Sequence, residues 1–68
     1  MVDANRLRSI IVLNGKTQED VAKHIGIAPK TFGMKMKKGV FGSDEIEIMV
    51  DYLNIDDPMS VFFVKTVT

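Results

Sequence analysis

The sequence of 68 residues contains no cysteine and a single histidine, and the scarcity of these residue types excludes several classes of site. Without thiols the chain can form neither a disulfide framework nor a thiolate metal site, and a cytoplasmic protein is expected. No apolar run approaches the length needed to span a membrane, and the first five residues do not resemble a signal peptide. Because a second histidine, a metal-ligand cluster and a phosphate-binding glycine loop are also lacking, we expect no enzyme and no cofactor.

A chain of this length forms one small domain, residues 1–68. Such a domain buries a modest fraction of its surface and is marginally stable unless something adds to the core. With no disulfide and no metal, a dimer interface is the expected additional source of stability.

The formal net charge is zero, but the charges are distributed unevenly. Up to Lys38 there are eight basic and three acidic residues, a net charge of +5. From Gly39 onward there are one basic and six acidic residues, a net charge of −5. The basic half is able to contact phosphate while the acidic half faces away, although small domains also divide charge in this way by chance.

Apolar periodicity and capping residues predict five helices, over about residues 5–13, 17–25, 28–38, 43–54 and 58–63. In the second helix, Thr17 can cap free backbone N–H groups and Asp20 places an acid in the first turn. Gly26 ends that helix, where a left-handed residue costs least. Asp44 and Glu47 form a capping-box-like pair at the start of the fourth helix.

The third predicted helix has an apolar side and a basic side. Phe32 and Met36, four residues apart, should point into the core, and Phe41 from the following loop should join them. The lysines of this helix should lie largely outward: Lys30, Lys35, Lys37 and Lys38. Gly33 costs about 1 kcal/mol relative to Ala inside a helix, which indicates close approach by another molecule or no role at all.

The apolar C-terminal segment from Val61 to Val67 is compatible with two structures. Its β-prone composition favours a short strand that pairs with a second copy of the chain. Alternatively, Asp57-Pro58 is a cap followed by a proline at the first helical position, which predicts a short helix that closes the core.

The segment from Thr17 to Lys37 carries a resemblance to a known family. Its motifs are Thr17-Gln18-Glu19-Asp20-Val21-Ala22 at the start, Gly26-Ile27 at a turn and Thr31-Phe32 in the following helix. With these motifs the chain resembles the Cro/phage-repressor family of helix-turn-helix proteins, over roughly residues 5–63. The resemblance implies an all-α, compact, five-helix lambda-repressor-like DNA-binding domain, with or without a short C-terminal β extension. Its helix-turn-helix unit would cover about residues 17–37, and its recognition helix about 28–38.

The resemblance also assigns positions in the interface with double-stranded DNA. Thr17 and Gln18 lie at the start of the first helix of the unit, where Gln18 would face a phosphate of DNA or brace a side chain of the recognition helix. The positions that face the major groove are Ala28, Pro29, Lys30, Thr31, Gly33 and Met34, and those near phosphates are Lys35, Lys37 and Lys38. Few of the groove-facing side chains can read base edges by paired hydrogen bonds, so direct readout is expected to be sparse.

The sequence therefore indicates two alternative functions. The first is a sequence-specific DNA-binding transcriptional regulator of the Cro/repressor type, acting as a homodimer through Val61–Val67 on a roughly palindromic site. The second is a protein-interaction module on the same fold, with an acidic partner on the lysines and an apolar contact at Gly33 and Met34. The lone His24 and the carboxylates of the fourth helix are expected to be solvated.

Overall fold

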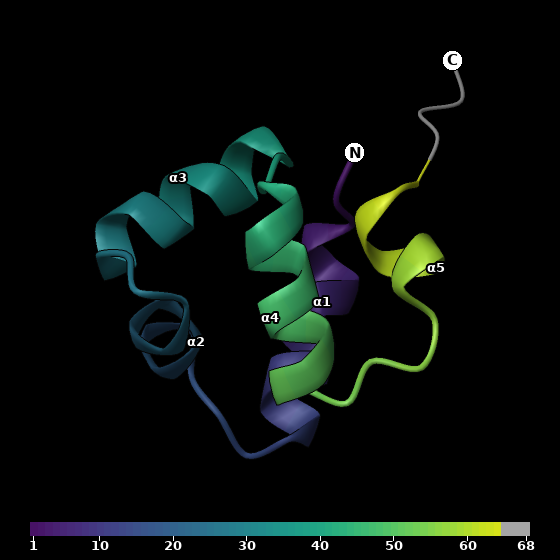
Figure 1. Ribbon diagram of the computed structural model, residues 1–68, viewed down its shortest axis with the longest axis horizontal. Coiled ribbons are helices and arrows are strands. Elements are labelled where there is room, and N and C mark those ends of the chain that lie inside the picture. Colours follow the sequence, from purple (N-terminus) through teal and green to yellow (C-terminus); the bar gives the residue numbers. More distant parts are fainter. Residues whose placement is uncertain (65–68) are drawn as a thin grey trace.

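Five α-helices follow one another in the computed structural model, which describes residues 1–64 (Figure 1). They are α1 (Ala4–Leu13), α2 (Gln18–Ile25), α3 (Pro29–Lys38), α4 (Ser43–Tyr52) and α5 (Pro58–Phe62). No strand occurs within residues 1–64, so the expected all-α class is confirmed for this part of the chain. Each helix begins and ends close to the position that the sequence pattern predicts.

Side chains at the helix ends explain most of these boundaries. The Thr17 hydroxyl oxygen accepts a hydrogen bond from the Asp20 N–H at 3.1 Å, and Asp20 accepts one from the Thr17 N–H at 2.8 Å. This reciprocal pair starts α2, and the hydrogen bond from the Thr17 N–H is the largest contribution that lowers the pKa of Asp20. Gly26 ends α2 with a φ of +94°, in the left-handed region predicted for it.

The fourth helix starts at Ser43 as predicted, but its capping interaction differs from the prediction. The helix begins at Ser43, with Gly42 as its cap, so the third helical position is Glu45 and not Glu47. Glu45 accepts a hydrogen bond from the Gly42 N–H at 2.7 Å. The predicted capping pair of Asp44 and Glu47 is therefore wrong, because the residue that caps the helix is Gly42, two positions before Asp44.

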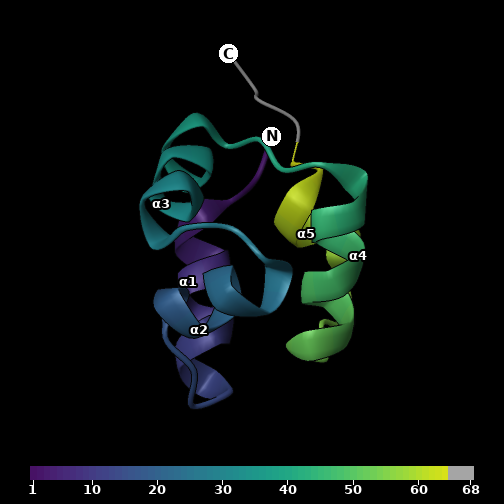
Figure 2. The same ribbon diagram turned by 60° about the vertical axis from the view of Figure 1, so that its left-hand side comes forward.

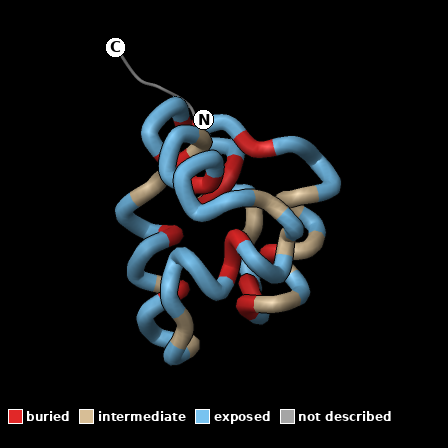
Figure 3. The backbone as a smooth tube through the Cα atoms, turned by 90° about the vertical axis from the view of Figure 1, so that its left-hand side faces the viewer, coloured by how far each residue is buried: buried red, intermediate tan, exposed pale blue. Residues whose placement is uncertain are grey.

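The core lies between the helices and contains only apolar side chains among the described residues. Phe32 from α3 and Phe41 from the loop after it are buried as predicted, with ring centroids 5.3 Å apart. The remaining buried residues are Val2, Leu7, Ile11, Val21, Ala22, Met36, Met49, Leu53, Ile55, Val61 and Phe62. Figure 3 colours the buried stretches of the chain red. Ile25 is only half-buried because it lies at the end of α2.

In Figure 1, α1 and α4 lie in the middle, with α2 and α3 on one side and α5 on the other. In the turned view of Figure 2, α1, α2 and α3 lie on one side and α4 and α5 on the other. Backbone hydrogen bonds fix the N-terminal segment between α3 and α5. The Val2 N–H donates to the Gly39 carbonyl at 2.9 Å, the Asp3 N–H to the Val61 carbonyl at 2.7 Å, and the Val64 N–H to the Met1 carbonyl at 2.9 Å. The end of α3, the N-terminus and the end of α5 are thereby held together.

For the C-terminal segment, the structure distinguishes between the predicted strand and the predicted helix as far as Val64. Val61 and Phe62 belong to α5 and are almost fully buried, so they close the core and form no strand. The rest of the predicted β extension, at residues 65–68, lies outside the described residues.

Candidate nucleic-acid interface

The α2–turn–α3 unit sets the orientation of α3. At the turn, the N–H groups of Gly26 and Ile27 both donate to the Ala22 carbonyl, at 2.9 and 3.0 Å. The Ala22 side chain is fully buried, so the two helices approach closely at this point. Phe32 then anchors α3 against the core, which leaves the opposite side of α3 facing outward.

The outward side of α3 contains most of the residues predicted to meet DNA. Met34 follows Phe32 by two positions, which corresponds to about 200° around the helix axis and places it on the far side from the core. Its side chain is 52% exposed. The other predicted residues that are exposed on α3 are Pro29, Lys30, Thr31, Gly33, Lys37 and Lys38. Figure 3 looks onto the side of the molecule with α2 and α3, and most of the chain facing the viewer is exposed.

No contact or backbone angle within the described chain requires a glycine at position 33. It lies in the α3 interior with a helical backbone, and a Cβ added there would have no heavy atom within 4 Å. The residue therefore costs helix stability without relieving any contact inside the described chain.

Lys35 differs from the other lysines and from the prediction that it lies outward. Its Nζ is 2.8 Å from both carboxylate oxygens of Glu45, and it is half-buried against α4. Burial opposes the charge of Glu45, but the hydrogen bonds from Lys35 and from the Gly42 N–H outweigh burial and lower the pKa of Glu45 below its usual value. Lys35 therefore joins α3 to α4, and the lysines of this face without an acidic partner among residues 1–64 are Lys30, Lys37 and Lys38.

The predicted residues at the two helix N-termini are exposed. Gln18 is the first residue of α2, and its side chain is accessible to a partner. Thr17 is also exposed, but its hydroxyl oxygen already caps the helix. Ala28 caps α3 without any side-chain hydrogen bond, so the first N–H groups of α3 are not covered by a capping side chain.

One contact between helices was missed from the sequence. The exposed ring of His24 stacks on Tyr52 of α4, with centroids 3.9 Å apart and ring planes 12° from parallel. Lys16 approaches the same Tyr52 ring, with its Nζ 5.1 Å from the centroid. No signal in the sequence indicated this cluster, because the three residues belong to separate segments that only the tertiary fold brings together.

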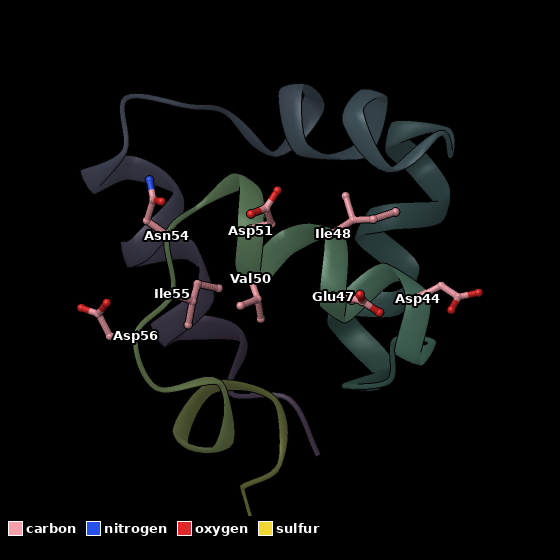
Figure 4. Close-up of a pocket in the computed structure, with 8 residues that line it drawn as sticks. All are labelled: Asp44, Glu47, Ile48, Val50, Asp51, Asn54, Ile55 and Asp56. Atoms are coloured by element: carbon pink, nitrogen blue, oxygen red, sulfur yellow. The ribbon is translucent and has the colours of Figure 1, made fainter.

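The acidic half of the chain forms a separate surface along α4. An open hollow of about 780 Å³ is lined by Asp44, Glu47, Ile48, Val50, Asp51, Asn54, Ile55 and Asp56. Figure 4 shows its carboxylates spread along the surface and not converging on one point. Among residues 1–64, no group of three potential ligands is placed to hold a metal ion. The solvated surface expected for the carboxylates of α4 agrees with the exposure of Asp44, Glu47 and Asp51. It is wrong for Glu45, which is partly buried and pairs with Lys35.

Comparison with known proteins returned no family model, no curated protein and no solved structure that matches the chain. No helix within residues 1–64 is long and apolar enough to cross a membrane. The residues themselves are therefore the basis for any functional proposal.

Proposed function

We propose that the protein is a sequence-specific DNA-binding transcriptional regulator of the Cro/repressor type, with a lambda-repressor-like arrangement of its five helices. The helix from about Ala28 to Lys38 enters the major groove. The observation that carries this proposal is the set of three exposed lysines without acidic partners, Lys30, Lys37 and Lys38, on the outward face of α3. They lie on the element that a helix-turn-helix directs at the DNA, where lysines contact phosphates.

The separation of charge supports the same orientation. The acidic residues Asp44, Glu47 and Asp51 line the hollow along α4, and none of them pairs with a lysine of the outward face. Glu45 is the acidic residue of α4 that approaches α3, and it forms a salt bridge with Lys35. A basic face and a distant acidic face orient the protein toward a polyanion.

The proposed regulator acts as a homodimer, because one module of this size contacts too little DNA to select a site. Since Val61 and Phe62 are buried, the interface first expected at Val61–Val67 retains only Phe63 and Val64 among the described residues. These two join Met1 and Val40 in a set of exposed apolar side chains, which we name the terminal apolar patch. The patch lies at the C-terminal end of α3, where the Val64 N–H donates to the Met1 carbonyl. Pairing two patches would bring the C-terminal ends of two α3 helices close together.

Selection from a random pool of duplexes tests the proposal, because it measures binding and returns the site. The selected duplex is then titrated at several salt concentrations. If three lysines per copy each neutralise one phosphate, the plot of log affinity against log salt concentration should have a slope of about −5 for a dimer. Failure to bind any duplex at low salt, or a slope near zero, would contradict DNA binding.

A protein-interaction module is the second candidate, and Met34 is the observation that favours it. An exposed methionine among lysines suits an acidic protein partner with an apolar pocket, and no Asn, Gln or Arg lies on the outward face of α3. This candidate predicts that selection from the duplex pool yields no preferred sequence.

A further inference from the structure

Met34 occupies the centre of the outward face of α3. On a helix the nearest surface neighbours of a residue lie three and four positions away, which for Met34 are Lys30, Thr31, Lys37 and Lys38. All four are exposed, and the core residues Phe32 and Met36 lie on the other side of the helix. The single large apolar side chain of this face is therefore surrounded by three lysines and a threonine.

The neighbouring positions make this centre more apolar and more open. Gly33 adds no side chain, and the space where its Cβ would lie is empty to 4 Å. Ala28, the exposed cap of α3, contributes only a methyl group. A partner that approaches along the lysines thus meets a flexible thioether chain that is the one large apolar side chain among them.

The chemistry of the major groove contains one apolar feature that fits such a side chain. Donors and acceptors on base edges are read by hydrogen bonds, which Met34, Gly33 and Ala28 cannot supply from their side chains. The C5-methyl group of thymine is the only apolar group that base pairs present there. A methionine that the lysines bring to the groove gains by covering such a methyl group, and its unbranched chain adapts to the position of the methyl.

We infer that Met34 is the specificity-determining residue of α3 and that it reads thymine methyl groups, so that the preferred sites contain thymines under the middle of the helix. This inference rests on the proposed function. It assigns the lysines to phosphates and assigns sequence preference to van der Waals contact at the centre of the same face.

Removal of the methyl groups alone provides the test. The duplex obtained by selection is synthesised with deoxyuridine in place of thymidine, first at all positions and then one position at a time. Base pairing is unchanged, and only the C5-methyl groups are lost. The wild-type chain should bind about fourfold more weakly for each methyl group that Met34 covers, as expected for a buried carbon of this kind.

The variant Met34→Ala assigns the effect to this side chain. It should bind the thymine duplex more weakly than the wild type and should no longer distinguish the thymine duplex from the uracil duplex at the contacted position. Met34→Leu should retain most of the discrimination, since it keeps an apolar side chain of similar volume. Met59→Ala is the matched control, because Met59 is 65% exposed and lies on α5, outside the outward face of α3. This control should respond to uracil as the wild type does.

The outcomes separate this inference from the proposed function. Equal binding of the thymine and uracil duplexes by the wild type overturns the inference and leaves DNA binding standing. Full sensitivity to uracil in Met34→Ala also overturns it, because the methyl groups are then read elsewhere. If no duplex binds at all, the proposed function and the inference both fail, and an acidic protein partner for this face becomes the better explanation.

Discussion

Replacing Gly33 with alanine should stabilise the folded protein and weaken its binding to DNA. Alanine is more favourable than glycine in a helix interior by about 0.8–1.0 kcal/mol. At Gly33 nothing offsets this gain, since the added Cβ has no neighbour within 4 Å and the backbone is helical. The free energy of unfolding should therefore rise by about 0.5–1 kcal/mol, which in a domain of this size raises the Tm by about 2–8 °C.

The effect of Gly33→Ala on binding should have the opposite sign. If the glycine lets α3 sit deep in the major groove, a methyl group in the empty space beside the helix will collide with the DNA. Urea unfolding followed by circular dichroism measures stability, and titration with the selected duplex measures affinity. Gly26→Ala is the control for stability, since φ at Gly26 is +94° and alanine there should destabilise the fold.

Two results would refute this reasoning. A loss of stability in Gly33→Ala would mean that α3 is not an open, regular helix at this position. A gain in stability with unchanged affinity for DNA would mean that Gly33 does not allow a close approach, and that its small size has no role in the complex.

Three further predictions concern the lysines, the acid dependence and the dimer. Lys37→Ala should reduce the magnitude of the salt slope by about one for each copy, whereas Lys35→Ala should leave the slope unchanged and cost about 1 kcal/mol of stability. The hydrogen bonds that lower the pKa of Glu45 despite its burial contribute stability that is complete above about pH 4.5, the ordinary pKa, and is lost as the pH falls through the lower folded value. Urea unfolding between about pH 3 and 6 should therefore show a weaker acid dependence in Glu45→Gln than in the wild type, and equal dependence would contradict this. Val40→Asp should convert the dimer to a monomer in sedimentation velocity, and a wild type that is strictly monomeric at high concentration would remove the terminal apolar patch as an interface.

Local sequence signals were sufficient for the helix boundaries. Thr17 and Asp20 are three residues apart and cap α2 through each other, so the interaction can be recognised without knowledge of the fold. The same holds for Gly26, whose left-handed backbone follows from its position after an apolar stripe. Phe32 and Met36 could be assigned to the core because their spacing of four places them on one side of a helix.

Contacts between helices could not be read from the same signals. Lys35 and Lys37 look alike in the sequence, but only Lys35 lies opposite Glu45 when α3 and α4 pack together. The stacking of His24 on Tyr52 likewise joins α2 to α4. Helical periodicity gives the side on which a residue lies, but it does not give the neighbour that the packing angle brings to that side.

The C-terminal segment shows the same limit. Val61 and Phe62 have high β propensity, and their local preference favoured a strand as much as a helix. In the structure they are helical and almost fully buried, because Pro58 starts α5 and the core has room for both side chains. Burial of apolar surface is worth more than the small difference in intrinsic propensity, so tertiary packing decided this segment.

The sequence by itself determined the five helices, the caps of α2 and the division into a basic and an acidic half, because these depend on residues that are neighbours along the chain. Only the tertiary structure decided that Lys35 of α3 pairs with Glu45 and which apolar residues are left exposed at the end of α5. These properties depend on which side chains the packed helices bring together. Local spacing does not encode that pairing.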